Sequence, residues 1–269
     1  MATSSLWPFN SPEAHEAISG IIRRRSTNSV DVREAALQGV DLSFARSILD
    51  LGCGFGFMAE TLAKRAAPNA RVVGVDVWQS NEKPFLDKVA STGRLPLFRR
   101  MQVNSELPWE AQSFDLVVCS YSLYFFTDVV PEVARILTPH GLFLALTHTE
   151  QSFIDPLRAA GLAVSQSSLH SLASSFSAEN GQRILERWFG EVSRTDYRNS
   201  LRFEMDHVDE LLAYLKFKLP FLISGSRPGA DLPEELAKHA RGSVSQDGGV
   251  TVEKSDTAFW CRSPICRPK

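Results

Sequence analysis

An acid and three closely spaced glycines near residue 50 could hold a ligand against the polypeptide backbone. The apolar run 48–51 contains Asp50, and glycines follow at positions 52, 54 and 56. Glycine accepts sharp turns and leaves no Cβ in the way of a bound molecule. Apolar residues spaced four apart across 58–66 then indicate a helix, whose first N–H groups would face the turn. The order of strand, glycine turn and helix predicts a cradle for a cofactor.

The spacing of the glycines distinguishes between cofactors. A dinucleotide fingerprint has its third glycine three residues after the second, but that position is Phe57 here. The motif LDLGCGFG, with an acid inside the strand end, resembles the first motif of class I S-adenosylmethionine-dependent methyltransferases. The resemblance implies that Asp50 orients the ammonium group of the cofactor and that its methionine part lies over Gly52, Cys53, Gly54 and Gly56. The alternative is an ordinary glycine-rich turn of another doubly wound fold.

A second acid ends the next apolar run, 71–76. Asp76 stands about 20 residues beyond Gly56, where a carboxylate can accept hydrogen bonds from both ribose hydroxyls of an adenosine. The resemblance implies this role for Asp76 and places Val77 or Trp78 beside the adenine ring. The alternative for Asp76 alone is a strand-end acid in solvent.

Two later segments are similar to the type 11 methyltransferase subfamily. The run 134–141, ARILTPHG, matches its segment before the fifth strand, with His140 in place of a glycine. The subfamily commonly has an acid that accepts from the adenine amino group after the third strand. This chain has Asn104 there, whose carbonyl can also accept. We expect Ser105 and Ser120 to complete the cofactor contacts.

Candidate catalytic residues follow the fourth and fifth expected strands. The loop 120–126 contains four aromatic residues and predicts an apolar wall. Methyl transfer is a direct displacement that needs alignment, and it needs a base only when the acceptor carries a proton. Tyr121 and His148 are the candidates for orienting or deprotonating an acceptor. The alternatives are a packing aromatic for Tyr121 and a backbone-bonded histidine for His148. We expect His15, His170 and His207 to be structural or solvated.

The remaining pattern predicts the elements that position these residues. Between 48 and 148, apolar strands alternate with helical patterns, which indicates a parallel sheet. An amphipathic helix is expected over 179–189, followed by late strands near 197–203 and 250–262. The expected fold class is therefore α/β: a doubly wound, seven-stranded, mostly parallel sheet of the Rossmann-like methyltransferase type, whose last strand runs antiparallel.

Segments outside this alternation are expected to cover the site. Ser11, Pro12 and Glu13 form a good helix start, and residues 1–44 are predicted to form a helical lid or extension. A helix packed on the sheet edge is the alternative. The methyltransferase domain would then span 45–269, with 150–178 and 205–247 as cap segments on the acceptor side.

Composition restricts the partners. The 269 residues carry a net charge of −2, which argues against a large nucleic-acid surface. No apolar run approaches the roughly 18 residues of a membrane span, and the start lacks the apolar region of a signal peptide. The four cysteines are expected to be reduced, as in a cytoplasmic protein. No metal site is expected, because Cys261 and Cys266 lack a second close pair.

The sequence therefore predicts an S-adenosylmethionine-dependent methyltransferase acting on a small, partly apolar acceptor. One alternative is a module of the same fold that binds the cofactor without turnover. Another is an aminopropyltransferase-like enzyme, which would need acids where the loop 120–126 has aromatics. The identity of the acceptor, its reacting atom and the oligomeric state stay open.

Overall fold

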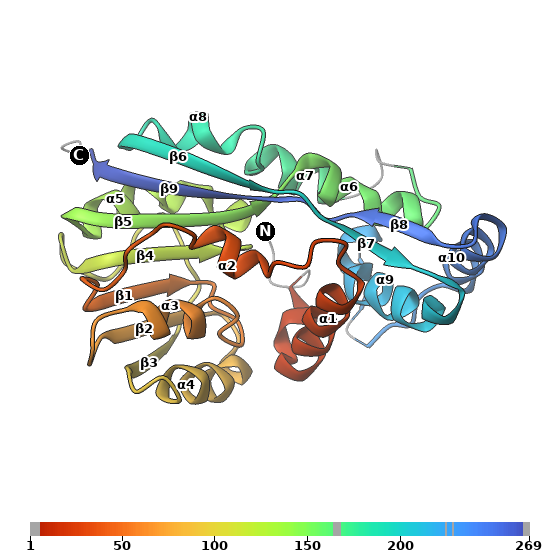
Figure 1. Cartoon of the computed structure of the whole chain (residues 1–269), viewed down its shortest axis with the longest axis horizontal. Helices are drawn as coiled ribbons and strands as arrows, with labels where there is room; N and C mark the ends of the chain where they lie inside the picture. The colour runs from red at the N-terminus through yellow and green to blue at the C-terminus, as the bar shows by residue number, and fades with distance from the viewer. Residues whose placement is uncertain (1–5, 164–167, 224, 228, 266–269) are drawn as a thin grey trace.

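A seven-stranded sheet with the order β3-β2-β1-β4-β5-β9-β6 forms the centre of the computed structural model, which describes residues 6–163, 168–223, 225–227 and 229–265 (Figure 1). The first five strands in this order are parallel, and β9 runs antiparallel to both β5 and β6. This confirms the predicted fold class. In sheet order, the strands are β3 (Leu95–Arg100), β2 (Arg71–Asp76), β1 (Ser47–Leu51), β4 (Phe114–Ser120), β5 (Leu137–His148), β9 (Asp256–Pro264) and β6 (Phe189–Tyr197).

Helices cover both faces of this sheet, so the central strands are buried on both sides and consist of nearly continuous apolar residues. Alternate residues of one strand belong to different cores: Ile48 packs with α2, α3 and α4, whereas Leu49 packs with α5, α6 and α9. The helices are α1 (Pro12–Arg25), α2 (Val32–Ala36), α3 (Ala59–Arg65), α4 (Glu82–Ala90), α5 (Val130–Ile136), α6 (Glu150–Ala159), α7 (Ser168–Ser175), α8 (Gly181–Leu185), α9 (Val208–Leu222) and α10 (Glu234–Asp247).

The edge strand β6 lies where the sequence predicted part of a helix. The helix expected over 179–189 is only α8, and β6 begins at Phe189. Most side chains of β6 between its two buried ends are exposed or half-buried. A polar edge strand has no apolar alternation to reveal it, which explains the error.

The strand expected near 197–203 belongs to a second, smaller sheet. Its strand β7 (Ser200–Phe203) pairs antiparallel with β8 (Val250–Glu253). Between them lie the short helix η7 (Met205–His207), α9 and α10. Figure 1 shows this group beyond one end of the main sheet, next to α1. Pro220 lies inside α9.

The N-terminal helix has the predicted limits. Ser11 Oγ accepts a hydrogen bond from the N–H of Ala14, and Pro12 occupies the first turn, where its missing N–H costs nothing. Among the helices of the described residues, none has both the length and the apolar character needed to cross a membrane.

Gly74 in β2 provides a test of the packing beneath the site. A Cβ at this position would lie 2.5 Å from Cζ of Phe85 and 2.8 Å from Sγ of Cys53. We expect Gly74→Ala to lower the free energy of unfolding by about 1–3 kcal/mol, as measured by urea denaturation, because the core must shift. The control is Gly242→Ala in α10, where a Cβ meets nothing within 4 Å. An equal loss in both variants would contradict the packing.

Candidate functional site

A cavity of about 630 Å³ opens at the carboxyl ends of β1, β2, β4 and β5. This size is typical of ligand sites, and this edge of a doubly wound sheet is where ligands bind. The wall opposite the strand ends comes from α1, from residues 28–33 and from α9. The cavity therefore lies between the main sheet and the elements expected to cover it.

The glycine loop follows β1 as predicted, but α3 begins at Ala59 and not at residue 56. All three glycines have positive φ, at 72°, 50° and 85°. Gly52 permits close packing, because a Cβ there would lie 2.6 Å from Cβ of Ser122. Gly54 lines the cavity, and a Cβ there would make an ordinary contact with the His15 ring at 3.8 Å. A ligand in the cavity can therefore lie close to the backbone at Gly54.

Asp50 is buried without a partner. Only 1% of its surface is exposed, and its Oδ1 has no hydrogen-bond partner in the structure. Burial, followed by repulsion from Asp76, raises the pKa of Asp50 to about 7. A buried acid without a partner is costly. A cationic ligand in the cavity would remove this cost by pairing with it.

Asp76 is more buried than the sequence suggested, and it also organises the loop. Its Oδ2 accepts a hydrogen bond from the N–H of Gly54 at 2.9 Å, and its Oδ1 accepts one from the N–H of Trp78 at 2.8 Å. Burial raises the pKa of this carboxyl although these hydrogen bonds oppose the change. Asp76 lines the cavity, so its carboxylate, which offers about four lone-pair sites, can still accept hydroxyl groups of a ligand.

Most of the other predicted cofactor contacts lie in the cavity wall. Val77, Trp78 and Ser120 line it, and the buried Oγ of Ser120 has no partner. Asn104 and Ser105 do not line it and are exposed. The lining residues of that segment are Met101, Gln102 and Val103, because β3 ends at Arg100, earlier than expected.

The loop after β2 ties the N-terminal segment to the cavity. Trp78 Nε1 donates to the carbonyl of Leu6 at 3.2 Å, Ser80 Oγ donates to the carbonyl of Asn10 at 2.7 Å, and Asn81 Nδ2 donates to the carbonyl of Phe9 at 3.3 Å. Leu6 and Phe9 are lining residues. The same strand end that supplies Asp76 thus also holds residues 6–10.

A second polar cluster lies in the cavity wall where β5 ends. His148 Nδ1 is 2.6 Å from Oδ1 of Asp256, which lies directly opposite it on β9. The hydroxyl of Tyr121 donates to Oδ2 of Asp256 at 2.8 Å, and Lys254 Nζ donates to both carboxylate oxygens at 3.1 and 3.0 Å. Tyr121 stacks on His148 with 4.6 Å between the ring centroids. We call these four residues the Asp256 cluster.

The charges of the Asp256 cluster follow from its burial. Burial alone would raise the pKa of Asp256, but Lys254 and His148 outweigh it and the pKa is lowered. Burial, followed by the charge of Lys254, lowers the pKa of His148 to about 4. A neutral His148 that donates from Nδ1 to Asp256 has its lone pair on Nε2, and within the described part of the chain no group hydrogen-bonds to Nε2. His148 therefore has the form of a general base.

Tyr121 cannot serve as a base in this arrangement. Burial, followed by Asp256, raises the pKa of its hydroxyl well above the usual range. Its φ of 56° is rare for a bulky side chain, and such strain concentrates at functional sites. The hydroxyl of Tyr121 is directed at Asp256. Of the two roles predicted for Tyr121, this geometry favours orienting over deprotonation.

Sequence reasoning missed Lys254, Asp256 and His15. The pattern Lys254-Ser255-Asp256 puts two charges on one face at the start of a predicted strand, and this was the available signal. His15 was expected to be structural, but it lines the cavity and its buried Nδ1 has no partner. Burial, followed by Lys218 and Lys88, lowers the pKa of His15 to about 4. His170 does not line the cavity.

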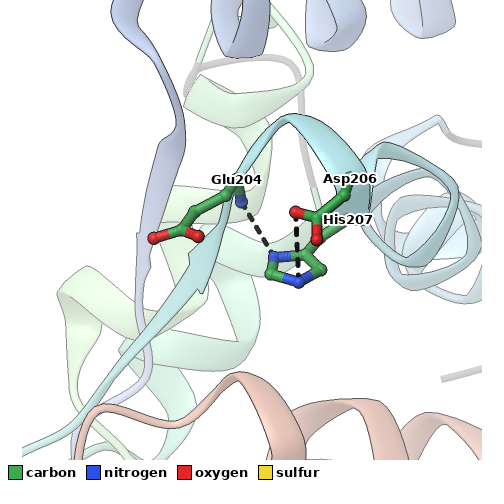
Figure 2. Close-up of side chains that lie close together, drawn as sticks. All are labelled: Glu204, Asp206 and His207. Atoms are coloured by element: carbon green, nitrogen blue, oxygen red, sulfur yellow. Dashed lines mark hydrogen bonds and ion pairs between the residues drawn. The ribbon is translucent and has the colours of Figure 1, made fainter.

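Glu204, Asp206 and His207 are the one group of metal-ligand residue types that comes together in the described residues. Figure 2 shows that the Glu204 carboxylate points away from the histidine ring. The Nδ1 of His207 accepts from the N–H of Glu204 at 3.1 Å, and Nε2 lies 3.3 Å from Asp206. This is a capping arrangement at the start of η7, and both ring nitrogens are already engaged.

Comparison with known proteins gives a family match over the centre of the chain. Residues 49–145 match the family model described as a methyltransferase domain. The nocamycin O-methyltransferase of Saccharothrix syringae is 32% identical over 123 residues, which are 45% of this chain and 40% of the relative. The ubiquinone biosynthesis O-methyltransferase of Hahella chejuensis is 29% identical over 114 residues, 40% of this chain and 47% of the relative. The chain spans less than half the length of these curated relatives.

Solved structures resemble this chain over most of its length. The YcgJ protein of Bacillus subtilis superposes with a TM-score of 0.54 at 17% identity, covering 88% of this chain and 98% of that protein. The BH2331 protein of Bacillus halodurans C-125 gives a TM-score of 0.55 at 14% identity, covering 87% and 99%. At these identities the likeness supports the fold alone.

The ionisation of His148 tests the geometry of the Asp256 cluster without any ligand. We expect Lys254→Met to raise the pKa of His148 from about 4 toward its ordinary value of 6.5, because the repelling charge is lost and Asp256 stays ionised. An NMR titration of the imidazole signals measures this. Lys238→Met, at an exposed position of α10, is the control. A His148 pKa that stays at about 4 in Lys254→Met would show that the cluster is wrongly placed.

Proposed function

Because residues 49–145 match the family model of a methyltransferase domain, we propose that the whole chain is an S-adenosylmethionine-dependent methyltransferase acting on a small molecule. The nocamycin and ubiquinone relatives are O-methyltransferases by name, and we propose a hydroxyl oxygen as the acceptor atom here. Methyl transfer to oxygen also suits the Asp256 cluster, since a hydroxyl acceptor carries a proton that must be removed.

The observation that carries this proposal is the buried carboxylate of Asp50, whose Oδ1 has no partner among the described residues and which lines the cavity together with Gly54. S-adenosylmethionine has an ammonium group and a sulfonium centre, so it can supply the positive charge that Asp50 lacks. Asp76 has free lone pairs for ribose hydroxyls, and Val77 and Trp78 lie beside it in the wall. The residues present therefore fit this cofactor.

When bound, the cofactor supplies a methyl group made electrophilic by its positive sulfur. His148 would accept the proton of the acceptor hydroxyl at Nε2, which prepares the hydroxyl oxygen to receive that methyl group. Asp256 holds the ring through Nδ1 and stabilises the imidazolium that forms. Tyr121 and Lys254 keep Asp256 ionised and in place.

A small-molecule acceptor is also favoured by the shape of the cavity. Its outer wall consists of α1 and α9, held together by ion pairs of Arg24 and Arg25 with Glu210. The net charge of −2 offers no general attraction for nucleic acid. Cys53, Cys119 and Cys261 are buried free thiols, in keeping with the proposed cytoplasmic location.

Substitution of His148 tests the catalytic proposal. A library of phenols and alcohols is incubated with S-adenosylmethionine, and methylated products are identified by mass spectrometry. We expect His148→Gln to lower kcat for the best acceptor by roughly 10²–10⁴-fold with unchanged cofactor affinity, since a general base is lost. The exposed His140→Gln is the matched control.

Two results would count against this account. Methyl transfer at the wild-type rate in His148→Gln would show that His148 is not the general base. Tight cofactor binding with no transfer to any compound would favour a module that binds without turnover.

The raised pKa of Asp50 predicts how cofactor affinity depends on pH. In the free protein Asp50 is protonated below about pH 7, and a bound ammonium group favours the ionised form, so binding releases a proton. Affinity for S-adenosylmethionine should therefore fall by up to about tenfold per pH unit below 7 and level off above it. Calorimetry at a series of pH values from about 5.5 to about 8.5 brackets this pKa and measures how the affinity depends on pH.

Asp50→Asn should bind weakly and show no such slope, because the amide does not ionise. Asp87→Asn, an exposed acid paired with Lys83, serves as the control. A wild-type affinity that stays constant through pH 7, or an identical slope in Asp50→Asn, would contradict the pairing of Asp50 with the cofactor.

A further inference from the structure

Lys218 of α9 is a basic side chain of the cavity wall without an acidic partner. The wall contains five basic residues, and three of them have carboxylate partners: Arg33 pairs with Asp31, Lys88 with Glu16, and Lys254 with Asp256. Arg23 is exposed to solvent. Lys218 is half-buried and forms no ion pair with any described residue. Its recorded contact is with the Tyr214 ring, 5.8 Å from Nζ to the centroid.

The position of Lys218 is set by the groups that feel its charge. Lys218 lines the cavity together with His15 and His148, and Lys218 and His148 also line a second, smaller pocket. In keeping with this placement, the charge of Lys218 helps to lower the pKa values of both histidines. Burial, followed by repulsion from Lys254, lowers its own pKa to about 8, with Asp256 opposing. At neutral pH it is still mainly a cation.

The charges at this end of the cavity do not balance. The Asp256 cluster holds one cation, Lys254, and one anion, Asp256, while His148 and Tyr121 are neutral. Lys218 therefore leaves one positive charge that is half-buried in the cavity wall and pairs with no carboxylate of the described residues. Removing a charge from water without a partner is unfavourable, so a ligand with a negative group is the partner that this wall lacks.

Aromatic rings also line the part of the wall that carries Lys218. Phe9 lies 5.5 Å from Phe217 and 6.1 Å from Phe221 between ring centroids, and Phe125 lies 6.4 Å from Phe221. A second, small pocket of about 20 Å³ is lined by Phe221 and shares Lys218, Phe9 and Phe125 with the cavity. These rings fit an apolar and flat body better than a polar one.

We propose that the acceptor is an apolar acid, an aromatic or similar body that carries an anionic oxygen group, and that Lys218 binds this group while the hydroxyl to be methylated faces His148. This inference rests on the proposed function and names its substrate class. Charge-assisted hydrogen bonds to an ammonium group are strong in a site that excludes water. An anchored anion would align the hydroxyl with the base.

The carboxylate of the cofactor is the competing partner for Lys218. This carboxylate is also an anion, and the glycine loop lines the same cavity as Lys218. The experiment must therefore measure cofactor affinity and acceptor affinity separately.

The test compares aromatic acids with their neutral amides. Para-hydroxybenzoate, salicylate and hydroxynaphthoate are each paired with the matching carboxamide. Their binding to the full chain is measured by calorimetry, with and without saturating S-adenosylhomocysteine. The variants are Lys218→Met, Lys218→Arg and the control Lys216→Met, whose exposed ammonium pairs with Asp231 at the surface.

We expect at least one acid to bind about tenfold or more tightly than its amide, since one added charge-assisted pair is worth at least that factor. Lys218→Met should abolish this preference, whereas Lys218→Arg and Lys216→Met should keep it. The affinity of S-adenosylhomocysteine should be the same in all four proteins.

Three results would overturn the inference. The first is equal binding of every acid and its amide to the wild type, and the second is a preference for acids that survives in Lys218→Met. The third is a loss of cofactor affinity in Lys218→Met, which would assign Lys218 to the cofactor. Failure of the proposed function is distinguishable, because it would appear as absent binding of S-adenosylhomocysteine to the wild type.

Discussion

Two neighbouring carboxylates, the buried Asp50 and the half-buried Asp76, lie at the carboxyl ends of β1 and β2, and neither forms an ion pair with a described residue. Each raises the free energy of the empty protein, because a buried charge without a partner is costly and like charges repel. Asp76 recovers part of this cost through the N–H groups of Gly54 and Trp78. Asp50 has no such compensation at Oδ1, because this atom accepts no hydrogen bond from the described residues. A cationic ligand is therefore the missing component of this end of the cavity.

The rest of the wall depends on that end of the sheet. The loop after β2 that carries Asp76 also holds residues 6–10 through three hydrogen bonds, and this segment leads into α1. Helix α1 packs in turn against α9, which carries Lys218. The acceptor end is thus assembled from elements whose positions are set at the cofactor end. These contacts connect the two ends of the cavity, so the position of one end depends on the position of the other.

The cavity wall around Asp50 could be predicted from the sequence because its residues are local. Asp50 and its glycines are adjacent in the chain, and parallel pairing of β1 with β2 brings Asp76 beside them. The acceptor half could not, because His148 and Asp256 are 108 residues apart and meet only through the antiparallel pairing of β5 with β9. A strand of this kind shows its apolar pattern in the sequence but not its neighbour in the sheet.

Errors in the prediction have the same physical origin. The strand β6 has polar residues because one of its edges faces no other strand, so its sequence lacks alternation. Asn104, which a family pattern carried over by position puts at the adenine, lies outside the cavity wall, and Gln102 and Val103 line it after the end of β3. Its contact with the adenine stays a prediction. Lys218 was invisible for another reason: on a helix of mixed pattern, a lysine that faces the cavity looks like any solvated lysine.

The central claim is that the glycine cradle with its unbalanced acids selects a cationic sulfonium cofactor over a dinucleotide. Calorimetric titration of the full chain at pH 8, about one unit above the pKa of Asp50, tests this most directly. The account predicts saturable binding of S-adenosylmethionine at one site per chain and no heat of binding with NAD. Saturable binding of NAD together with no binding of S-adenosylmethionine would contradict it.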